Sequence, residues 1–326
     1  MTPIRRRRFI VVSAAAAGLP ILPAAAAPGP MLHVWRGNVL GADAVLQLHH
    51  PDAATARRLI AASLEEVARL ERQLSLYRDD SALVRLNRVG VLEDPPFDLL
   101  RVLADSARFH ALTGGAFDVT VQPLWDLYAA HFAQPNADAA GPPAAAVAAA
   151  VARVGWNRVT LDAGRVTLAP GTAITLNGIA QGYVTDRVAE LLRRGGIAHA
   201  LVDMGETRAL GSYPDGGPWR VGLEDPAAPG QVAERIALAD QAVATSGGYG
   251  TQFDKAGRFN HIFDPGTGGS SWRYAAVSVV AAEAATADAL STGFSLLPAD
   301  RIAALARSQD AAVHLAYADG RREVLS

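Results

Sequence analysis

Apolar residues recur at helical spacing in several segments of the chain. Within residues 53–74, side chains such as Leu59, Val67 and Leu70 fall on one face of a helix, while arginine and glutamate occupy the other. The helix predicted over residues 97–112 ends at Gly114-Gly115, a common stop signal. Further helices are predicted over residues 144–154, 179–194, 285–296 and 299–307.

Shorter apolar or alternating stretches, separated by turn residues, predict strands. They cover residues 42–48, 158–161, 165–168, 200–204, 219–223, 235–238, 242–245, 259–263 and 274–281. The turn Asp162-Ala163-Gly164 predicts one hairpin, and residues 318–320 predict a closing one. Hairpin-linked strands with irregularly inserted helices favour an α+β fold, with antiparallel sheets and flanking helices.

The first 27 residues follow a different pattern. Four arginines at residues 5–8 precede a mostly apolar stretch over residues 9–22, and Ala25-Ala26-Ala27 offers a small-residue cleavage site. The arginines resemble the twin-arginine motif, which directs folded proteins across the bacterial inner membrane. The alternative is a signal anchor, but the apolar stretch is shorter than the roughly 20 residues of a spanning helix. We expect residues 1–27 to be a twin-arginine export signal and residues 28–326 to form a periplasmic domain.

Composition narrows the functional classes. The chain has 326 residues and a formal charge of -2; without residues 1–27 it carries 26 basic and 32 acidic groups, a charge of -6. This balance argues against nucleic-acid binding. The sequence has no cysteine, which excludes disulfides, thiol catalysis and cysteine-bound metals. It also lacks a Walker A motif, a G-x-S-x-G elbow and a complete G-x-G-x-x-G motif.

Four segments remain that carry candidate chemistry: residues 114–120, residues 176–183, residues 245–249 together with 260–268, and residues 287–292. The second places two glycines at a helix start, whose N–H groups suit a phosphate, although an ordinary loop-to-helix junction has the same pattern. In the fourth, Asp288 and Thr292 lie four residues apart on one face of a predicted helix. This oxygen pair suits Mg²⁺, although taken alone such a pair is more often an exposed acid near a helix start.

The order of these segments, with Ser75-Leu76-Tyr77-Arg78-Asp79-Asp80-Ser81 before them, resembles the ApbE family of FAD:protein FMN transferases. The resemblance runs from about residue 36 to residue 297. Its most specific part is Ala287-Asp288-Ala289-Leu290-Ser291-Thr292, following the loop that begins at His261. It implies an α+β, T-fold-related architecture over residues 28–326.

The resemblance also implies site residues. The Mg²⁺ ligands would be Asp288, Thr292 and the main-chain carbonyl of Gly178. His261 would lie close to the reacting phosphate, and either His261 or Asp288 could accept the proton of the attacking hydroxyl. The positions implied to contact FAD are Tyr77, Ala116, Phe117, Asp118, Thr175, Gln181, Ser246 and Phe263.

The implied activity is Mg²⁺-dependent transfer of FMN from FAD to a threonine or serine hydroxyl of a periplasmic or membrane partner protein, with release of AMP. Two alternatives stay open: an FAD pyrophosphatase that gives FMN and AMP, and a non-catalytic periplasmic FAD carrier. The chain departs from the family pattern at Thr175, where an acid is usual, and at Gln181, where a lysine is usual. The segment Thr175-Leu176-Asn177-Gly178-Ile179-Ala180-Gln181-Gly182, with the twin-arginine signal, is similar to a subgroup serving nitrous oxide respiration, whose partner is a membrane flavoprotein.

Overall fold

The computed structural model describes residues 10–12 and 31–326, so most of the predicted export signal at residues 1–27 lies outside the described residues. The helices are α1 Ala53–Leu74, α2 Ala82–Val89, α3 Phe97–Thr113, α4 Gln122–Phe132, α5 Ala144–Val151, α6 Ala180–Arg194, α7 Ala284–Phe294 and α8 Ala299–Ser308. The strands are β1 Ile10–Val12, β2 Met31–Val39, β3 Ala42–His50, β4 Val91–Glu93, β5 Val159–Asp162, β6 Arg165–Leu168, β7 Ala200–Asp203, β8 Thr207–Leu210, β9 Trp219–Asp225, β10 Ala228–Leu238, β11 Ala242–Ser246, β12 Ala276–Ala281, β13 Ala312–Ala316 and β14 Arg322–Leu325.

The strands form three antiparallel sheets. The largest has eight strands in the order β14-β13-β12-β11-β8-β7-β3-β2, and the smaller sheets have the orders β1-β9-β10 and β4-β6-β5. Neighbouring strands pair antiparallel throughout these sheets, as in β11 with β12 and β7 with β8. The predicted α+β fold with antiparallel sheets and flanking helices is therefore confirmed.

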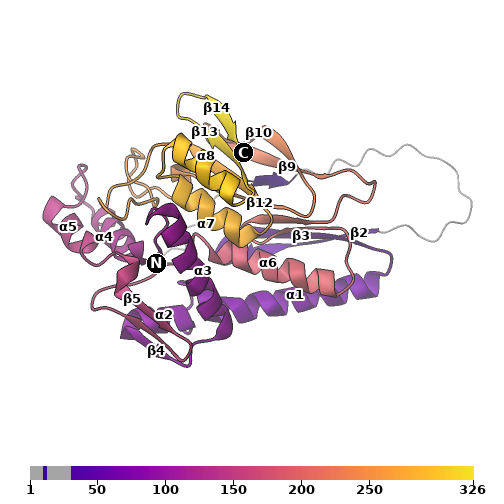
Figure 1. The fold of residues 1–326 in the computed structure, drawn as a ribbon, viewed down its shortest axis with the longest axis horizontal. Helices are drawn as coiled ribbons and strands as arrows, with labels where there is room; N and C mark the ends of the chain where they lie inside the picture. Colours follow the sequence, from indigo (N-terminus) through magenta and orange to yellow (C-terminus); the bar gives the residue numbers. More distant parts are fainter. Residues whose placement is uncertain (1–9, 13–30) are drawn as a thin grey trace, which may run out of the picture.

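Both faces of the large sheet are covered, because successive side chains of a strand point to opposite faces. In β7, Ala200 and Val202 belong to the main core beside the helices, whereas Leu201 belongs to a second core with Trp219 and Val221 of β9. Figure 1 shows α1 and α6 on one side of β2 and β3, with β9 and β10 on the other side. The helices therefore approach the sheet from one face, and α6 also packs against α7.

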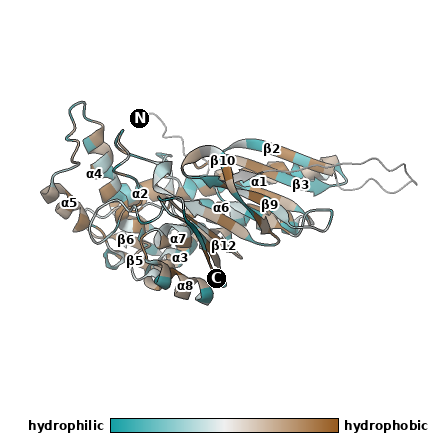
Figure 2. Cartoon of the chain, turned by 90° about the horizontal axis from the view of Figure 1, so that it is seen from above, coloured by the Kyte–Doolittle hydropathy of each residue, from teal (hydrophilic) through white to brown (hydrophobic). Residues whose placement is uncertain are grey.

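The edge strand β2 is exposed and continues into a tight turn. Hydrophilic and hydrophobic residues are mixed along it without regular alternation (Figure 2), and most of its positions are exposed or half-buried. The turn to β3 consists of Leu40 and Gly41, both with positive φ, as a two-residue hairpin of matching twist requires. The backbone N–H of Leu40 donates to Glu71 of α1 at 2.8 Å, which fixes the hairpin against the helix layer.

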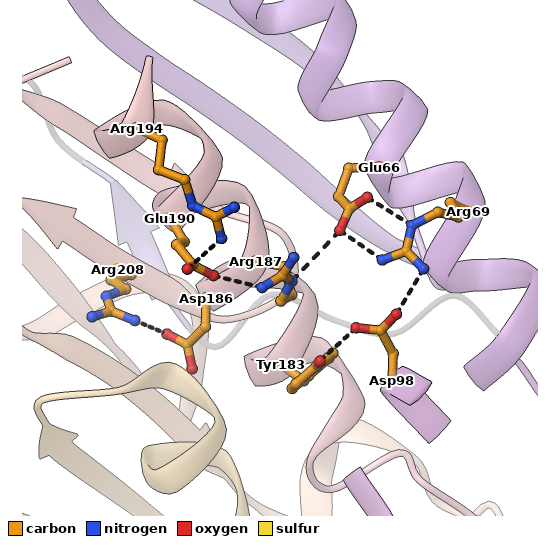
Figure 3. A network of polar contacts seen from close by, with 9 residues as sticks. All are labelled: Glu66, Arg69, Asp98, Tyr183, Asp186, Arg187, Glu190, Arg194 and Arg208. Atoms are coloured by element: carbon orange, nitrogen blue, oxygen red, sulfur yellow. Dashed lines mark hydrogen bonds and ion pairs between the residues drawn. The ribbon is translucent and has the colours of Figure 1, made fainter. Parts of the chain in front are cut away.

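A polar network joins three helices behind the sheet (Figure 3). Arg69 of α1 donates to Glu66 at 2.8 Å and to Asp98 of α3 at 2.6 Å, and the Tyr183 hydroxyl of α6 donates to the other Asp98 oxygen at 2.6 Å. Burial opposes ionisation of Asp98, but the hydrogen bonds from Arg69 and Tyr183 outweigh it and hold the pKa of this carboxyl below its usual value. Within the described residues, no helix is both long and apolar enough to span a bilayer.

Most predicted elements are confirmed, but the strand predicted over residues 259–263 is wrong. That segment makes only isolated bridges, at Asn260 and at Phe263. The Asn260 side chain donates to the carbonyl of Ser271 and accepts from the N–H of Ile262, both at 2.8 Å, so side-chain hydrogen bonds replace a strand ladder. The sequence patterns also failed to indicate β2, α2, β4, α4 and β8.

Candidate active site

One cavity of about 470 Å³ brings together loops and element ends that are far apart in the sequence. The ends of β7 and β11, the start of α6 and one face of α7 contribute to it. All twelve residues predicted for the site line this cavity: Tyr77, Ala116, Phe117, Asp118, Thr175, Gly178, Gln181, Ser246, His261, Phe263, Asp288 and Thr292.

The loop before α6 lies against the face of α7 that carries Asp288 and Thr292. A Cβ atom built on Gly178 would stand 2.8 Å from the Thr292 hydroxyl oxygen, so the glycine backbone and this hydroxyl are close neighbours. Asp288 is 3% exposed, and its Oδ2 accepts a hydrogen bond from the backbone N–H of Gly182 at 3.1 Å. The Ser246 hydroxyl lies 3.2 Å from that of Thr292. The three predicted metal-binding positions are thus assembled around one contact between α6 and α7.

The oxygen groups at this contact fit a hard divalent cation. A carboxylate, a hydroxyl and a main-chain carbonyl are the ligand types that Mg²⁺ accepts, with water or substrate oxygens completing its shell. In the part of the chain that the structure describes, no three His, Cys, Asp or Glu side chains gather into a metal-binding group. A metal here would therefore depend on Thr292 and Gly178 as well as on Asp288.

The lining of the cavity is acidic. Six carboxyl side chains line it, and no lysine or arginine does so among the described lining residues. The carboxylates belong to Asp43, Asp79, Asp118, Asp203, Glu206 and Asp288. An anionic ligand such as a pyrophosphate would be repelled by this lining unless a cation were bound with it.

A carboxylate shapes the turn that follows α3. Asp118 Oδ1 accepts from both the N–H and the hydroxyl of Thr120, at 2.8 and 2.5 Å. Its Oδ2 lies 3.3 Å from Nδ1 of His110. The adjacent Asp118 carboxylate raises the pKa of His110, although burial of the ring opposes this. The predicted contact positions 116–118 are therefore held in place by an ion pair with α3.

Tyr77 and Phe117, two aromatic residues predicted to contact FAD, lie in different environments. Phe117 is 2% exposed and packs edge-on against Phe109 in the core, at 6.1 Å between ring centroids. Tyr77 is 59% exposed, and its hydroxyl lies 3.4 Å from the Asn177 side-chain amide. Tyr77 can therefore offer a ring face to a planar ligand, whereas Phe117 forms part of the cavity wall.

His261 is oriented by a backbone carbonyl. Its ring Nδ1 lies 3.2 Å from the carbonyl oxygen of Thr251, and its backbone N–H donates to the same oxygen. A carbonyl only accepts, so Nδ1 carries the hydrogen and Nε2 is the ring nitrogen that can accept a proton. The histidine therefore has the tautomer that a general base requires.

Four of the six acids of the cavity were not among the predicted site residues, and two of these four are buried. Asp203 and Glu206 are 5% and 6% exposed and flank Gly205, whose φ is +108°. A Cβ on Gly205 would stand 2.6 Å from the side-chain nitrogen of Gln181, so the Gln181 side chain fits here only because residue 205 is a glycine. A usable signal was the position of Asp203 at the end of an entirely apolar strand.

The ApbE family model matches residues 40–315 of the chain. FAD:protein FMN transferase of Haemophilus influenzae is 34% identical over 256 residues, covering 74% of this chain and 73% of that protein. The Vibrio cholerae enzyme of the same name is 35% identical over 266 residues, covering 79% and 78%. Among solved structures, the flavin transferase ApbE from Vibrio cholerae superposes with a TM-score of 0.79 at 29% identity, covering 91% of this chain and 98% of that one. The flavinyl transferase ApbE of Pseudomonas stutzeri gives 0.78 at 27% identity, covering 91% and 96%.

Proposed function

The chain belongs to the ApbE family, and we propose that it transfers FMN from FAD to a threonine or serine hydroxyl of a partner protein, with release of AMP. The observation that carries the proposal is the single cavity in which all twelve residues implied by the family lie together. Support also comes from curated relatives named FAD:protein FMN transferase, which match about three quarters of this chain.

In the proposed reaction, the acceptor hydroxyl oxygen attacks the phosphorus of the FMN half of FAD. A new P–O bond forms to the acceptor, and the bond between this phosphorus and the bridging oxygen breaks. AMP leaves with that oxygen. The hydroxyl proton passes to Nε2 of His261, whose opposite nitrogen is held by the Thr251 carbonyl.

We further propose that the reaction depends on Mg²⁺. Bound by Asp288, Thr292 and the Gly178 carbonyl, the ion would supply positive charge to the pyrophosphate oxygens. The argument is electrostatic, since the cavity is lined by carboxylates and the usual family lysine is Gln181 in this chain. None of the described lining residues is a lysine or an arginine, so the bound metal would supply positive charge that these side chains do not.

The protein's own residues place the other parts of FAD in this proposal. The exposed Tyr77 ring packs on a planar ring of FAD. The N–H groups at the start of α6 are already hydrogen-bonded, because Ala180 donates to Leu176, Gly182 to Asp288 and Tyr183 to Ile179. The phosphate binding that the sequence suggested for this helix start is therefore not part of the proposal. Asp118 keeps the turn over residues 116–121 in shape through Thr120.

One experiment separates this function from its alternatives. The purified protein is incubated with FAD, Mg²⁺ and a partner fragment that carries a Ser/Thr-Gly-Ala-Thr acceptor, such as one from a membrane flavoprotein of nitrous oxide respiration. Covalent FMN on the fragment, seen by mass, together with AMP supports transfer. AMP and free FMN without an adduct would instead show a pyrophosphatase, and intact bound FAD would show a carrier.

A matched pair of variants tests the metal assignment. Asp288→Asn should lower Mg²⁺-dependent transfer at least 100-fold, because it removes the carboxylate while keeping the side-chain shape. Asp300→Asn, on the exposed first turn of α8, serves as the control and should retain activity. Full activity of Asp288→Asn would remove Asp288 from the reaction.

We also propose that the domain is exported to the periplasm by the twin-arginine route. The support is the arginine run at residues 5–8, followed by an apolar stretch and a small-residue cleavage site. Replacing Arg6 and Arg7 with lysine should retain the protein in the cytoplasm, as measured by cell fractionation. Unchanged periplasmic recovery would contradict this route.

A further inference from the structure

A second cavity lies beside the 470 Å³ cavity proposed to bind FAD, called the flavin cavity below, and shares a loop with it. It measures about 430 Å³ and is lined by Ala129, Phe132, Ala133, Tyr249, Gly250, Thr251, Gln252 and Phe253. Gly250 and Thr251 line both cavities. The volume falls within the range of about 300–1,000 Å³ that is typical of ligand sites. The residues assigned to FAD and Mg²⁺ do not line this second cavity.

A single layer of aromatic rings separates the two cavities elsewhere. Phe253 of the second cavity stacks on Phe263 of the flavin cavity, at 5.8 Å between ring centroids. Phe253 also packs against Trp125, another residue of the flavin cavity, at 5.7 Å. A molecule held in the second cavity would therefore lie one side chain away from the flavin site.

The shared loop also holds His261. The Thr251 carbonyl accepts from the His261 backbone and lies 3.2 Å from its ring nitrogen. Thr251 therefore connects the second cavity with the proposed proton acceptor. A chain that passes over Gly250 and Thr251 would bring a hydroxyl to the side of the flavin cavity where His261 lies.

The chemistry of the second cavity differs from that of the first. None of its eight lining residues carries a formal charge, whereas six carboxylates line the flavin cavity. Its walls consist of aromatic rings, two alanines and a few neutral polar groups, and Phe132 and Phe253 are only half-buried. Partly exposed aromatic rings without charge are typical of protein-binding surfaces, whereas a nucleotide phosphate would require cations or N–H donors.

We propose that this second cavity is the docking site for the acceptor protein, and that it holds an uncharged, extended segment next to the acceptor threonine or serine. The inference rests on the proposed function and adds where the partner binds. The segment crosses Gly250 and Thr251, so its hydroxyl enters the flavin cavity beside His261 while FAD occupies its own site. The second cavity therefore determines which hydroxyls are modified.

Filling the cavity tests this assignment. Ala133 follows the last turn of α4, is exposed and lines the cavity, so Ala133→Trp places a large ring at its mouth. Gln252→Trp places a large ring in the cavity from the loop over residues 249–253. Ala130→Trp is the matched control, because Ala130 is exposed on the same helix but does not line the cavity. Thermal melting verifies that each variant is folded.

Two measurements are made with a Ser-Gly-Ala-Thr acceptor peptide. In the transfer assay, both filling variants should lower kcat/KM for the peptide at least tenfold, mainly through KM, with FAD affinity unchanged within twofold. Ala130→Trp should match the wild-type protein. Transfer within twofold of wild type in both folded filling variants would overturn the docking site.

Peptide binding, measured by fluorescence anisotropy without FAD, distinguishes failure of the docking site from failure of the proposed function. If the wild-type protein binds the peptide and the filling variants do not, the docking site stands even where no FMN is transferred. If the filling variants bind the peptide as tightly as wild type, or the wild-type protein fails to bind it, the docking assignment is wrong whatever the transfer assay gives.

Discussion

Gly182 of α6 lies directly against the backbone of α7, and enlarging this residue should disturb both stability and the metal site. A Cβ at this position would lie 2.3 Å from the carbonyl oxygen of Ala284 and 2.7 Å from the Cα of Ala285. Ordinary contact begins at 3.4 Å, so the two backbones would have to separate by about 1 Å. No side-chain rotation can relieve the clash, because all of the close atoms belong to the backbone.

Two opposing contributions determine how much Gly182→Ala changes the free energy of unfolding. Overpacking a core contact costs about 1–3 kcal/mol, and a clash with backbone favours the upper end. Alanine regains about 1 kcal/mol of helix propensity over glycine. We therefore expect the free energy of unfolding to fall by about 2 kcal/mol, which corresponds to roughly 3 °C in Tm for a domain of about 300 residues.

The assay combines urea unfolding with an Mg²⁺ titration of AMP release. Because the Gly182 N–H donates to Asp288, separation of the helices should also raise the Mg²⁺ concentration needed for half-maximal activity. Gly164→Ala is the control, since a Cβ in this hairpin turn meets no atom within 4 Å. A Gly182→Ala protein with wild-type stability and unchanged Mg²⁺ dependence would refute the close-contact reasoning.

Three further predictions concern charged and exposed groups. Arg208→Met removes the ion-pair partner of the Asp186 carboxylate, whose pKa is raised by burial. The free energy of unfolding, measured with urea, should fall by about 3–5 kcal/mol. A fall of less than about 1 kcal/mol would contradict this prediction. Asp118 raises the pKa of His110 in the folded state, so the ion pair stabilises the fold fully below the unfolded pKa of about 6.5 and loses this effect as pH rises through the folded pKa. The difference in unfolding free energy between wild type and His110→Gln should therefore shrink between pH 6 and pH 9. A difference independent of pH would exclude a stabilising His110–Asp118 ion pair. Tyr77→Ala should weaken FAD binding at least fivefold while leaving Tm unchanged, because the ring is 59% exposed; unaltered FAD titration would remove Tyr77 from the site.

Local patterns predicted the amphipathic and turn-bounded elements well. The helix over residues 53–74 has the bounds of α1, because Leu59, Val67 and Leu70 are buried along its apolar face. The edge strand β2 was missed because most of its positions are exposed, so it lacks a clean apolar signal. Helix α4 was missed although Trp125, Tyr128 and Phe132 follow helical spacing and pack on one side against Phe253 and Phe259.

The site followed from motif order, whereas its environment depended on tertiary contacts. Asp288 and Thr292 could be paired from their spacing alone, and the structure places both in the cavity. No local pattern distinguishes the exposed ring of Tyr77 from the buried ring of Phe117. The second cavity forms where α4 meets residues 249–253. These two segments are more than a hundred residues apart, so no local sequence pattern predicts the cavity.

The Asp98 network has a consequence for how the molecule opens. Asp98 receives hydrogen bonds from Arg69 of α1 and from Tyr183 of α6, so neither helix can detach without leaving a buried carboxylate short of a donor. Amide protons in α1, α3 and α6 should therefore exchange with solvent through one shared opening event. These three helices would then behave as a single cooperative unit, and the start of α6, which borders the flavin cavity, would remain ordered for as long as that unit is closed.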